Sequence, residues 1–399
     1  MVGVVSVLGV MASLFWLGLW LATVRHRDAV IRLADLPAEA PGGGWPSLAV
    51  VFAARNEEEA VGPATRSFLA QDYPGLEVIA VDDRSTDATG AILDAIAAGE
   101  DRLRVVHVRE LPGGWLGKTH ALQSAFEATS ATWLLFSDAD VILAPGALRR
   151  AVAWAGCEGI DHMAVMFDTV TEHEGERMFL AFFGLISDVY APRWQVAARA
   201  SRTYVGVGAF NLVRAEAFHA IGGFHRVAFS VDDDMRLGQA LKVAGYASRL
   251  VVGRGVVSVR WQVGLAGMIR GLEKNSFAVV DYRLPVAALA TLAIVVLGMA
   301  PHAGVFVGPW WTRALCVVGI GSVALLLGGS EGQSGVTWRH ALTLPIGAFA
   351  CAIALVRSTW LTLWRGGVRW RDHHYPLAEL RAHVRRRNAW ASEVWRSTR

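Results

Sequence analysis

The sequence predicts an α/β fold, with a mostly parallel sheet in a soluble domain that is joined to membrane helices at both ends of the chain. In the middle of the chain, short apolar stretches typical of strands alternate with helical stretches. Such alternation builds a parallel sheet with helices on both faces. Hydrophobic residues make up 53% of the 399 residues and charged residues only 18%. This balance is too apolar for an ordinary soluble protein and indicates membrane segments.

Four strands are expected in the soluble part, and polar side chains follow three of them. The strands are predicted at residues 47–54, 77–81, 102–108 and 132–136. Helices are predicted up to residue 70, through Ile92 and Ile96, and over residues 119–128. The polar clusters are Arg55–Glu59, Asp82–Asp83 and Asp138–Asp140. Because ligands of such sheets bind beyond the carboxyl ends of the strands, we expect a site at this edge.

Four uncharged stretches come near the roughly 17–25 residues that are needed to cross a bilayer. They are Val2–Val24, Val286–Thr312, Ala314–Ser330 and His340–Val356. No positively charged region precedes the first stretch, so we expect a retained anchor rather than a cleaved signal. Arginines 25, 27 and 32 place its end in the cytoplasm.

The membrane topology contains a conflict. Three further crossings would place the C-terminal tail outside, whereas the many arginines of the tail favour the inside. One apolar stretch is therefore expected to be re-entrant or to lie in the interface, and Pro301 and Pro309 point to Val286–Thr312.

The predicted organisation has four parts. They are an N-terminal anchor (1–24), a cytoplasmic catalytic domain (25–283), membrane helices (284–364) and a basic tail (365–399). Within the domain, residues 264–283 include the amphipathic stretch Gly267–Val280, which is expected at the membrane surface. We expect a multi-pass protein of the cell's inner membrane. The net charge is +3, and basic residues near membrane junctions suit anionic lipid headgroups rather than nucleic acid. The three cysteines form no disulfide framework or Cys-x-x-Cys metal motif.

Asp138 and Asp140 follow a buried strand with one residue between them, so their charges repel. Two carboxylates in this D-x-D spacing can share one Mg²⁺ or Mn²⁺ ion, which keeps positions for substrate phosphates. The alternative is a solvated turn. Upstream, the glycines of LPGGWLGKTHAL (111–122) allow close backbone approach, and Lys118 can meet a phosphate. The alternative there is a plain loop with a surface lysine.

Two further acidic clusters each have two explanations. Asp82 and Asp83 can accept hydrogen bonds from a nucleoside, or they cap a helix, for which Asp87 is equally placed. Three aspartates in VDDDMRLG (231–238) precede a helical pattern, and negative charge stabilises a helix N-terminus. The functional explanation needs one of them as a general base toward an acceptor hydroxyl.

The ordered set of motifs resembles the family 2 glycosyltransferases, which are inverting enzymes of the Rossmann-like GT-A fold. The resemblance covers about residues 46–278. It rests on AARNEE, VDDRSTDAT, GWLGK, SDADV, and then residues 206–224 and 233–245. It implies that Arg55, Glu57, Asp82, Asp83 and Lys118 bind the donor. It also implies that Asp138 and Asp140 hold diphosphate and metal, and that Asp234 is the catalytic base with Asp233 before it.

The anchor and the membrane cluster look like those of lipid-glycosylating members, such as the hopanoid-associated, carotenoid and ceramide enzymes. Those members often carry Q-x-x-R-W, but residues 257–261 read VSVRW here, with Val257 in place of Gln. Arg260 and Trp261 are expected to contact the diphosphate or the acceptor. The alternative is a packing tryptophan beside an arginine that reaches the surface.

The sequence thus predicts a membrane-bound hexosyltransferase with Mg²⁺ or Mn²⁺ as cofactor. It would move a sugar from a UDP- or GDP-sugar to a hydroxyl of a lipid or amphiphilic acceptor by direct displacement. One alternative is a polyprenyl-phosphate sugar synthase, whose acceptor needs no strong base. A processive polysaccharide synthase would need more helices for a channel. A scaffold or nucleotide sensor would not need the acidic clusters.

Overall fold

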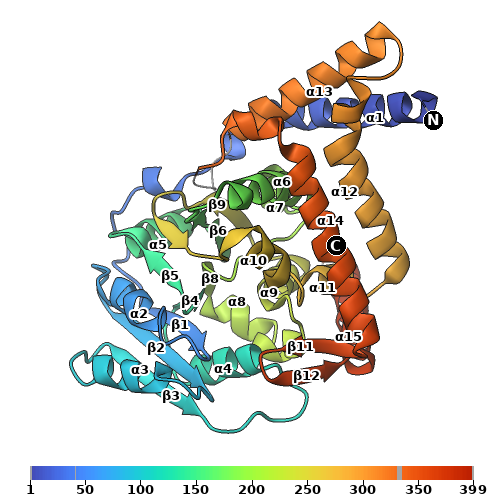
Figure 1. Ribbon diagram of the computed structural model, residues 1–399. Coiled ribbons are helices and arrows are strands. Elements are labelled where there is room, and N and C mark those ends of the chain that lie inside the picture. Colours follow the sequence, from blue (N-terminus) through green and yellow to red (C-terminus); the bar gives the residue numbers. More distant parts are fainter. Residues whose placement is uncertain (1, 41, 330–334, 398–399) are drawn as a thin grey trace. The chain divides into compact units, whose positions relative to one another are not determined.

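The computed structural model describes residues 2–40, 42–329 and 335–397. The chain forms two compact units, each made of separate stretches (Figure 1). We call them the sheet unit (Val30–Thr169, Arg193–Arg260 and His383–Arg399) and the helical unit (Met1–Ala29, Val170–Pro192 and Trp261–Ala382).

The sheet unit is built on a seven-stranded sheet in the order β3-β2-β1-β4-β8-β6-β9. The strands are β1 (Leu48–Ala54), β2 (Leu76–Asp83), β3 (Leu103–Val108), β4 (Trp133–Asp138), β6 (His162–Met166), β8 (Asn211–Arg214) and β9 (Ser248–Val252). β8 runs antiparallel to β4 and β6, and every other neighbouring pair is parallel. The predicted mostly parallel α/β fold is confirmed.

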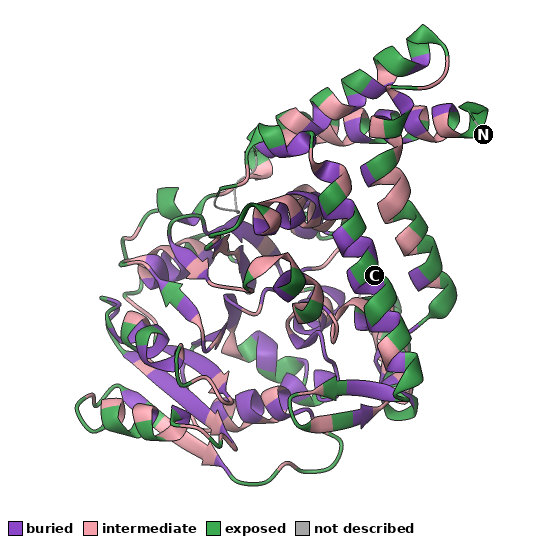
Figure 2. Ribbon diagram, viewed as in Figure 1, coloured by how far each residue is buried: buried purple, intermediate pink, exposed green. Residues whose placement is uncertain are grey.

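Helices cover this sheet, so its central strands are buried on both faces (Figure 2). They are α2 (Val61–Leu69), α3 (Thr89–Ala97), α4 (Gly117–Phe126), α5 (Ala147–Cys157), α7 (Arg193–Ala197), α8 (Ala215–Ala220) and α9 (Asp233–Val243). One core cluster packs Val51 and Ile79 of the sheet against Phe218 and Leu237. Burial on both faces explains why β1 and β4 read as continuous apolar runs rather than as alternating patterns.

A smaller sheet continues the sheet unit beyond β4. It contains β5 (Val141–Leu143), β10 (Val257–Val259) and β7 (Asp168–Thr169), in the order β5-β10-β7. The strands and helices predicted for residues 47–136 are all present, with ends shifted by a few residues.

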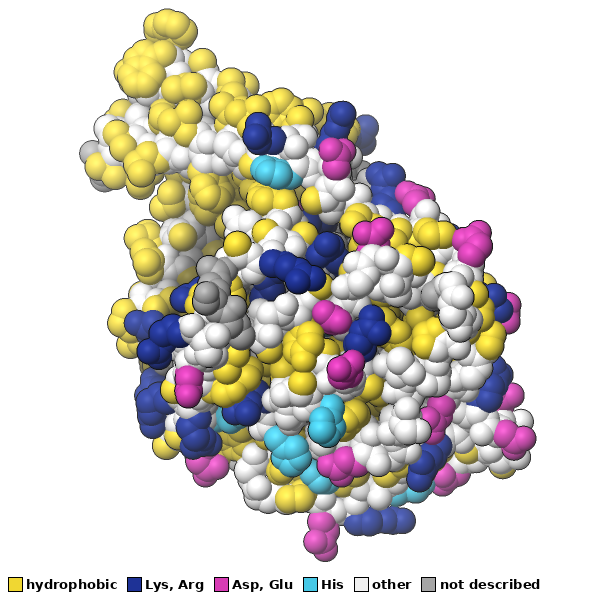
Figure 3. All heavy atoms as spheres, turned by 180° about the vertical axis from the view of Figure 1, so that it is seen from behind, with side chains coloured by type: hydrophobic (Ala, Val, Ile, Leu, Met, Phe, Trp, Pro, Cys, Tyr) yellow, Lys and Arg dark blue, Asp and Glu magenta, His cyan; other side chains and the backbone are white. Residues whose placement is uncertain are grey.

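The helical unit contains four helices that are long and apolar enough to cross a membrane, counted over the described residues. They are α1 (Val2–Arg25), α12 (Leu284–Gly304), α13 (Trp310–Gly328) and α14 (Leu344–Trp364). α1 lies beside α13, and α12 lies beside α14 (Figure 1). Large hydrophobic side chains cover much of the surface of α1 and α13 (Figure 3).

Shorter elements complete this unit. They are α6 (Glu174–Tyr190), α10 (Gly264–Gly271), α11 (Ser276–Val279) and a hairpin of β11 (Gly367–Trp370) and β12 (His373–Pro376). α15 (Leu377–Ser397) begins in the helical unit, and its residues from His383 onward belong to the sheet unit. There, Arg226 lies over the ring of Trp390 at 4.4 Å from its centroid.

Two predicted membrane stretches differ from the structure. The stretch 286–312 is interrupted: α12 ends at Gly304 and α13 begins at Trp310, because Gly308 adopts a φ of 85° and Pro309 lacks an N–H. The last stretch begins with a short 3-10 helix at Trp338–Ala341 and becomes α-helical at Leu344, from where α14 continues to Trp364. The amphipathic stretch 267–280 forms two short helices, α10 and α11, and its place at the membrane surface stays a prediction.

The position of α9 depends on two glycines. A Cβ atom on Gly238 would lie 1.7 Å from the carbonyl oxygen of Val205, and one on Gly206 would lie 1.8 Å from that of Asp234. These distances are far shorter than any real contact, so the first turns of α9 press directly on the chain at 205–206. The aspartates that begin α9 are thereby fixed in place.

We predict that Gly238→Ala lowers the free energy of unfolding of the sheet unit by about 1–3 kcal/mol, the range for overpacking a tight site. The measurement is thermal unfolding of the purified protein in detergent. Gly113→Ala is the matched control, because nothing lies within 4 Å of a Cβ atom there. Equal melting temperatures for the two variants would contradict the close contact.

Candidate active site

The carboxyl ends of three parallel strands lie level with one another and carry polar groups. In the pairing of β1 with its neighbours, Ala54 lies opposite Asp82 of β2, and Ala53 lies opposite Asp138 of β4. The predicted clusters that follow β1, β2 and β4 therefore share one edge of the sheet. The glycine-rich loop that precedes α4 and the start of α9 supply the remaining residues.

Lys118 is the centre of this edge. Its Nζ donates a hydrogen bond to Oδ1 of Asp138 at 2.6 Å and lies 3.6 Å from Oδ2 of Asp233. Burial alone would lower the pKa of Lys118, but the charges of Asp138, Asp233 and Asp234 outweigh it, so the pKa is raised. The lysine is therefore a permanent cation, and not the surface side chain of a plain loop.

Asp234 is held by backbone groups with its carboxylate directed at the same place. Its Oδ2 accepts a hydrogen bond from the Gly208 N–H at 2.8 Å, and its Oδ1 accepts one from the Met235 N–H at 2.7 Å. Burial and the neighbouring charge of Asp233 raise the pKa of Asp234 to about 7. A carboxyl group with this pKa can exchange a proton near neutral pH.

Gly208 allows the carboxylates to approach each other. A Cβ atom there would lie 2.7 Å from Oδ2 of Asp138 and 3.4 Å from Oδ2 of Asp234. A small cavity opens at this point between β4, β8, α4 and α9. Its polar lining consists of Lys118, Ser137, Gly208, Asn211, Asp233 and Asp234.

The three consecutive aspartates have separate surroundings. Asp232 is buried and forms an ion pair with Arg236, also buried, at 2.8 Å. Asp233 faces Lys118, and Asp234 faces Gly208. Asp232 therefore has a structural role as the partner of Arg236, whereas Asp233 and Asp234 lie in the first turn of α9, as the structural explanation expects, and also face the site.

Asp140 lies near other carboxylates. Burial, together with the charges of Asp138 and Glu57, raises the pKa of Asp140 to about 7. A divalent cation beside these carboxylates would relieve that repulsion, and their oxygens are ligands that Mg²⁺ and Mn²⁺ prefer. No group of three His, Cys, Asp or Glu side chains within the described ranges is arranged to hold a metal by itself. A cation here would need further ligands from substrate phosphate and water.

Asp82 and Asp83 form the other end of the edge. Asp83 is buried and accepts two hydrogen bonds from Arg84, at 2.7 and 3.0 Å, with Arg55 3.9 Å away. Asp82 lies 3.0 Å from Nδ1 of His107, and this hydrogen bond raises the pKa of that histidine. The N–H of Thr89, the first residue of α3, donates a hydrogen bond to Asp87 at 2.9 Å. Asp87 therefore caps this helix, and Asp82 and Asp83 do not.

The loops after β1 and β2 are tied together by residues of the AARNEE and VDDRSTDAT motifs to which sequence reasoning gave no individual role. Asn56 accepts a hydrogen bond from the Thr86 N–H at 2.8 Å, and Glu58 accepts one from the Ala88 N–H at 3.0 Å. Asn56 and Arg84 have φ values of 53° and 58°, a left-handed conformation that is uncommon outside glycine. Neither spacing nor residue type predicts this arrangement, since it depends on which strands are neighbours.

Arg260 and Trp261 fall on either side of the boundary between the units. Trp261 belongs to the helical unit, where its ring centroid lies 5.3 Å from that of Phe183. This contact agrees with the packing alternative for Trp261. A contact of Arg260 or Trp261 with diphosphate or acceptor stays a prediction.

Residues 49–222 match Glycosyl transferase family 2. The chain thus contains a family 2 glycosyltransferase domain, and the resemblance inferred from the motifs is confirmed.

The chain is similar to two kinds of curated protein. It is 28% identical over 285 residues to the beta-monoglucosyldiacylglycerol synthase of Synechocystis sp., covering 62% of this chain and 57% of the relative. It is 26% identical over 234 residues to the 4,4'-diaponeurosporenoate glycosyltransferase of Staphylococcus aureus, covering 57% of this chain and 60% of the relative. The chain thus spans somewhat more than half the length of these relatives.

A solved structure has a similar fold. It is a mannosyltransferase from Pyrobaculum calidifontis in complex with GDP-Man and Mn²⁺, with a TM-score of 0.56 and 19% sequence identity. The similarity covers 89% of this chain and 99% of that chain.

The surroundings of Asp234 lead to a pH-dependent prediction. Its pKa is raised from an ordinary value near 3.8 to about 7, so the folded state binds more protons than the unfolded state between these pH values. The contribution of Asp234 to stability therefore falls as the pH rises through this window. We expect Asp234→Asn to melt at a higher temperature than the unsubstituted protein, by a margin that grows from pH 5 to pH 8.

The neighbouring Asp232→Asn is the contrasting variant. Because it leaves Arg236 buried without its carboxylate, it should destabilise the protein by about 3–5 kcal/mol. If Asp234→Asn were as destabilising as Asp232→Asn at pH 8, the assignment of separate roles would be wrong.

Proposed function

We propose that the protein transfers a sugar from a nucleotide-sugar to a hydroxyl group of a lipid or amphiphilic acceptor, with inversion at the anomeric carbon. The observation that carries this proposal is the cluster around Lys118 at the strand edge: Lys118 donates a hydrogen bond to Asp138, and Lys118, Asp233 and Asp234 line one small cavity. Three of these four groups are acidic and one is a permanent cation. This combination suits a reaction in which a proton is removed at one point and negative charge builds up at another.

The donor's nucleoside would lie at Asp82 and Asp83, and its diphosphate near Lys118. Arg84 donates a hydrogen bond to the carboxylate of Asp83 and fixes its orientation, so Asp83 would accept a hydrogen bond from the nucleoside without first having to be ordered. Gly117 keeps this place open, since a Cβ atom there would lie 2.3 Å from Oδ2 of Asp83. Positive charge on Lys118 would stabilise the diphosphate as it leaves.

Asp138 and Asp140, with Glu57 nearby, would hold Mg²⁺ or Mn²⁺. The donor set fits, because the pKa of Asp140 is raised by burial and by the nearby charges of Asp138 and Glu57, and a cation would offset that negative charge. When bound, the ion would supply electrostatic stabilisation of the diphosphate oxygens. The Mn²⁺ in the similar mannosyltransferase is consistent with this choice of metal.

Asp234 would act as the general base. The Gly208 and Met235 N–H groups hold its two oxygens, so the carboxylate keeps one orientation toward the cavity. It would take the proton of the acceptor hydroxyl while that oxygen forms a bond to the anomeric carbon. The bond from this carbon to the diphosphate breaks on the opposite face, which inverts the centre.

The acceptor is proposed to be a lipid for two reasons. The chain has four helices that are apolar enough to cross a membrane, counted over the described residues. The relatives it resembles are named for a monoglucosyldiacylglycerol product and for 4,4'-diaponeurosporenoate. We further propose that the protein is a multi-pass protein of the cell's inner membrane whose catalytic domain is cytoplasmic, where UDP- or GDP-sugars would reach the strand edge.

We predict that Asp234→Asn reduces sugar transfer by at least about 100-fold, the lower range for loss of a general base. Donor binding should change little, because Lys118 and Asp138 stay in place. Transfer is measured as nucleoside diphosphate release in the presence of acceptor, and binding by titration calorimetry.

The control is Asp101→Asn, which removes an exposed carboxylate elsewhere on the sheet unit. Loss of donor binding in Asp234→Asn would refute the base assignment. Full transfer by Asp234→Asn would favour a phosphate acceptor, as in a polyprenyl-phosphate sugar synthase, since a phosphate needs no strong base.

A further inference from the structure

α14 differs from the other three apolar helices in how it is packed. In its most apolar stretch, 61% of α14 is buried, against 28% for α1, 17% for α12 and 33% for α13. The remaining surface of α14 and its N-terminal turn is a stripe of exposed apolar side chains three or four residues apart, which places them on one face. The stripe consists of Leu342, Ile346, Phe349, Ile353, Val356, Trp360 and Trp364.

The buried face of α14 lies along α6. A Cβ atom on Gly347 would lie 2.1 Å from the carbonyl oxygen of Met178, so the two backbones touch. Further along, Phe179, Phe182 and Leu185 of α6 share one apolar cluster with residues of α14. The members from α14 are Leu344, Ala348, Ala350, Cys351 and Ala354.

The chain connections of α6 prevent it from crossing a membrane. α6 is joined to the sheet unit by a short link at each end. Its first residue, Glu174, lies five residues after Thr169 of the sheet unit, and its last residue, Tyr190, lies three residues before Arg193 of the sheet unit. Five extended residues span at most about 18 Å and three about 11 Å, whereas the bilayer core is about 30 Å thick. Both ends of α6 therefore lie on the side of the membrane that holds the sheet unit.

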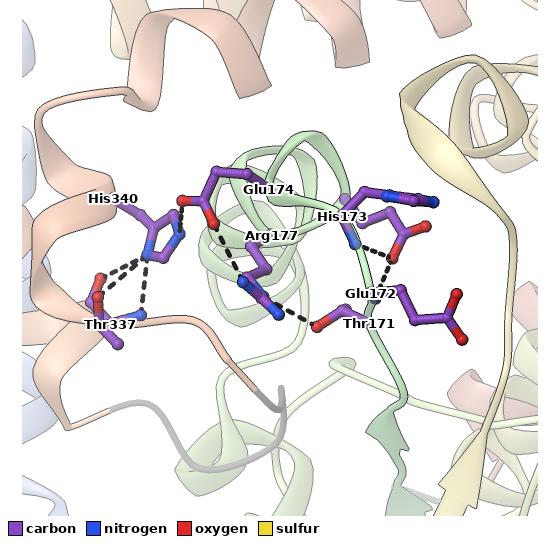
Figure 4. A network of polar contacts seen from close by, with 8 residues as sticks. Thr171, Glu172, His173, Glu174, Arg177, Thr337 and His340 are labelled. Atoms are coloured by element: carbon purple, nitrogen blue, oxygen red, sulfur yellow. Dashed lines mark hydrogen bonds and ion pairs between the residues drawn. The ribbon is translucent and has the colours of Figure 1, made fainter.

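Polar contacts also tie the N-terminal end of α14 to α6 (Figure 4). His340, buried in the turn before α14, lies 2.9 Å from Oε1 of Glu174, and this glutamate also accepts a hydrogen bond from Arg177 at 3.2 Å. At the other end, Arg357 and Arg365 donate hydrogen bonds to Glu273 at 3.1 and 2.7 Å.

The segment that holds Glu273 is itself close to the start of α6. The N–H of Gly264, at the start of α10, donates a hydrogen bond to Oε1 of Glu176 at 2.6 Å. From Gly264, the eight residues of α10 and two more steps reach Glu273, which is at most about 19 Å. Both ends of α14 are thus anchored to segments that remain on one side of the membrane.

We propose that α14 lies in the plane of the membrane interface instead of crossing it, with its apolar stripe immersed in lipid. This inference does not depend on the proposed reaction. It assigns to α14 the interfacial position that the sequence led us to expect for one apolar stretch.

The partner of the stripe is the lipid bilayer itself. α12, which lies beside α14, also has exposed apolar side chains, among them Leu289 and Leu292. Two tryptophans, 67% and 73% exposed, end the stripe at Trp360 and Trp364, and arginines 365, 369 and 371 follow. Tryptophan and arginine side by side are typical of the zone where acyl chains meet anionic headgroups.

The test measures immersion depth along the stripe. Ile346→Cys, Ile353→Cys and Trp360→Cys are each made in a Cys157→Ser background, in which Cys316 and Cys351 are buried. Each variant is spin-labelled in phosphatidylglycerol-containing vesicles, and depth is read from the relaxation caused by oxygen and by a water-soluble nickel chelate. An in-plane helix gives the same depth at all three sites within a few Å, whereas a crossing helix gives a difference of about 21 Å over 14 residues.

The control is a pair of sites on α1, Val4→Cys and Leu14→Cys, both exposed, which should differ by about 15 Å over ten residues. A depth that changes steadily along α14 would overturn the proposal. Spin–spin broadening between labels, together with little relaxation by oxygen, would also overturn the proposal. Such spectra would mean that a second copy of the chain, and not lipid, covers the stripe.

A second measurement does not require labels on the stripe. Arg339→Cys and Arg369→Cys lie beyond the two ends of α14 and are both exposed. With an impermeant maleimide, both should react only in permeabilised cells, as the exposed native Cys157 of the sheet unit should do. Reaction of either one in intact cells would contradict an in-plane helix.

Discussion

The candidate site depends on one buried cation, Lys118, placed among carboxylates from β4 and α9. Without its charge, the carboxylates of Asp138, Asp233 and Asp234 would repel one another in a poorly solvated place. With it, one strand end and the starts of two helices are held together through side chains 2.6 and 3.6 Å away. In the proposed reaction the same charge would stabilise a diphosphate, so the group that holds these carboxylates together would also bind the donor.

Glycine makes this density of charge sterically feasible. Gly117, Gly206, Gly208 and Gly238 each stand where a Cβ atom would meet a neighbouring atom at less than 3 Å. Two of them admit α9 against the chain at 205–206, and two leave room beside the carboxylates of Asp83 and Asp138. The motifs GWLGK and GVGAFN are therefore required by close approach of chain segments as much as by contact with a ligand.

Much of the sheet and its acidic edge could be predicted from the sequence, because central parallel strands are continuous apolar runs and ligands gather at their carboxyl ends. Residues 133–140, WLLFSDAD, contain both features: an apolar strand and the carboxylates at its carboxyl end. Spacing could not separate Asp232 from Asp234, since their roles depend on whether Arg236 or Gly208 is the neighbour. It could not reveal His107 beside Asp82, which requires the β2–β3 register. Length and hydropathy also could not distinguish α14 from a crossing helix, because the difference is the contact with α6.

The most direct test of the account is nucleoside diphosphate release by the purified protein in detergent. A panel of UDP- and GDP-sugars would be offered with and without Mn²⁺ and with and without a lipid extract. The account predicts release with at least one donor, dependent on the metal and increased by the lipid. No release with any combination of donor, metal and lipid, from protein that is folded and binds nucleotide, would contradict it.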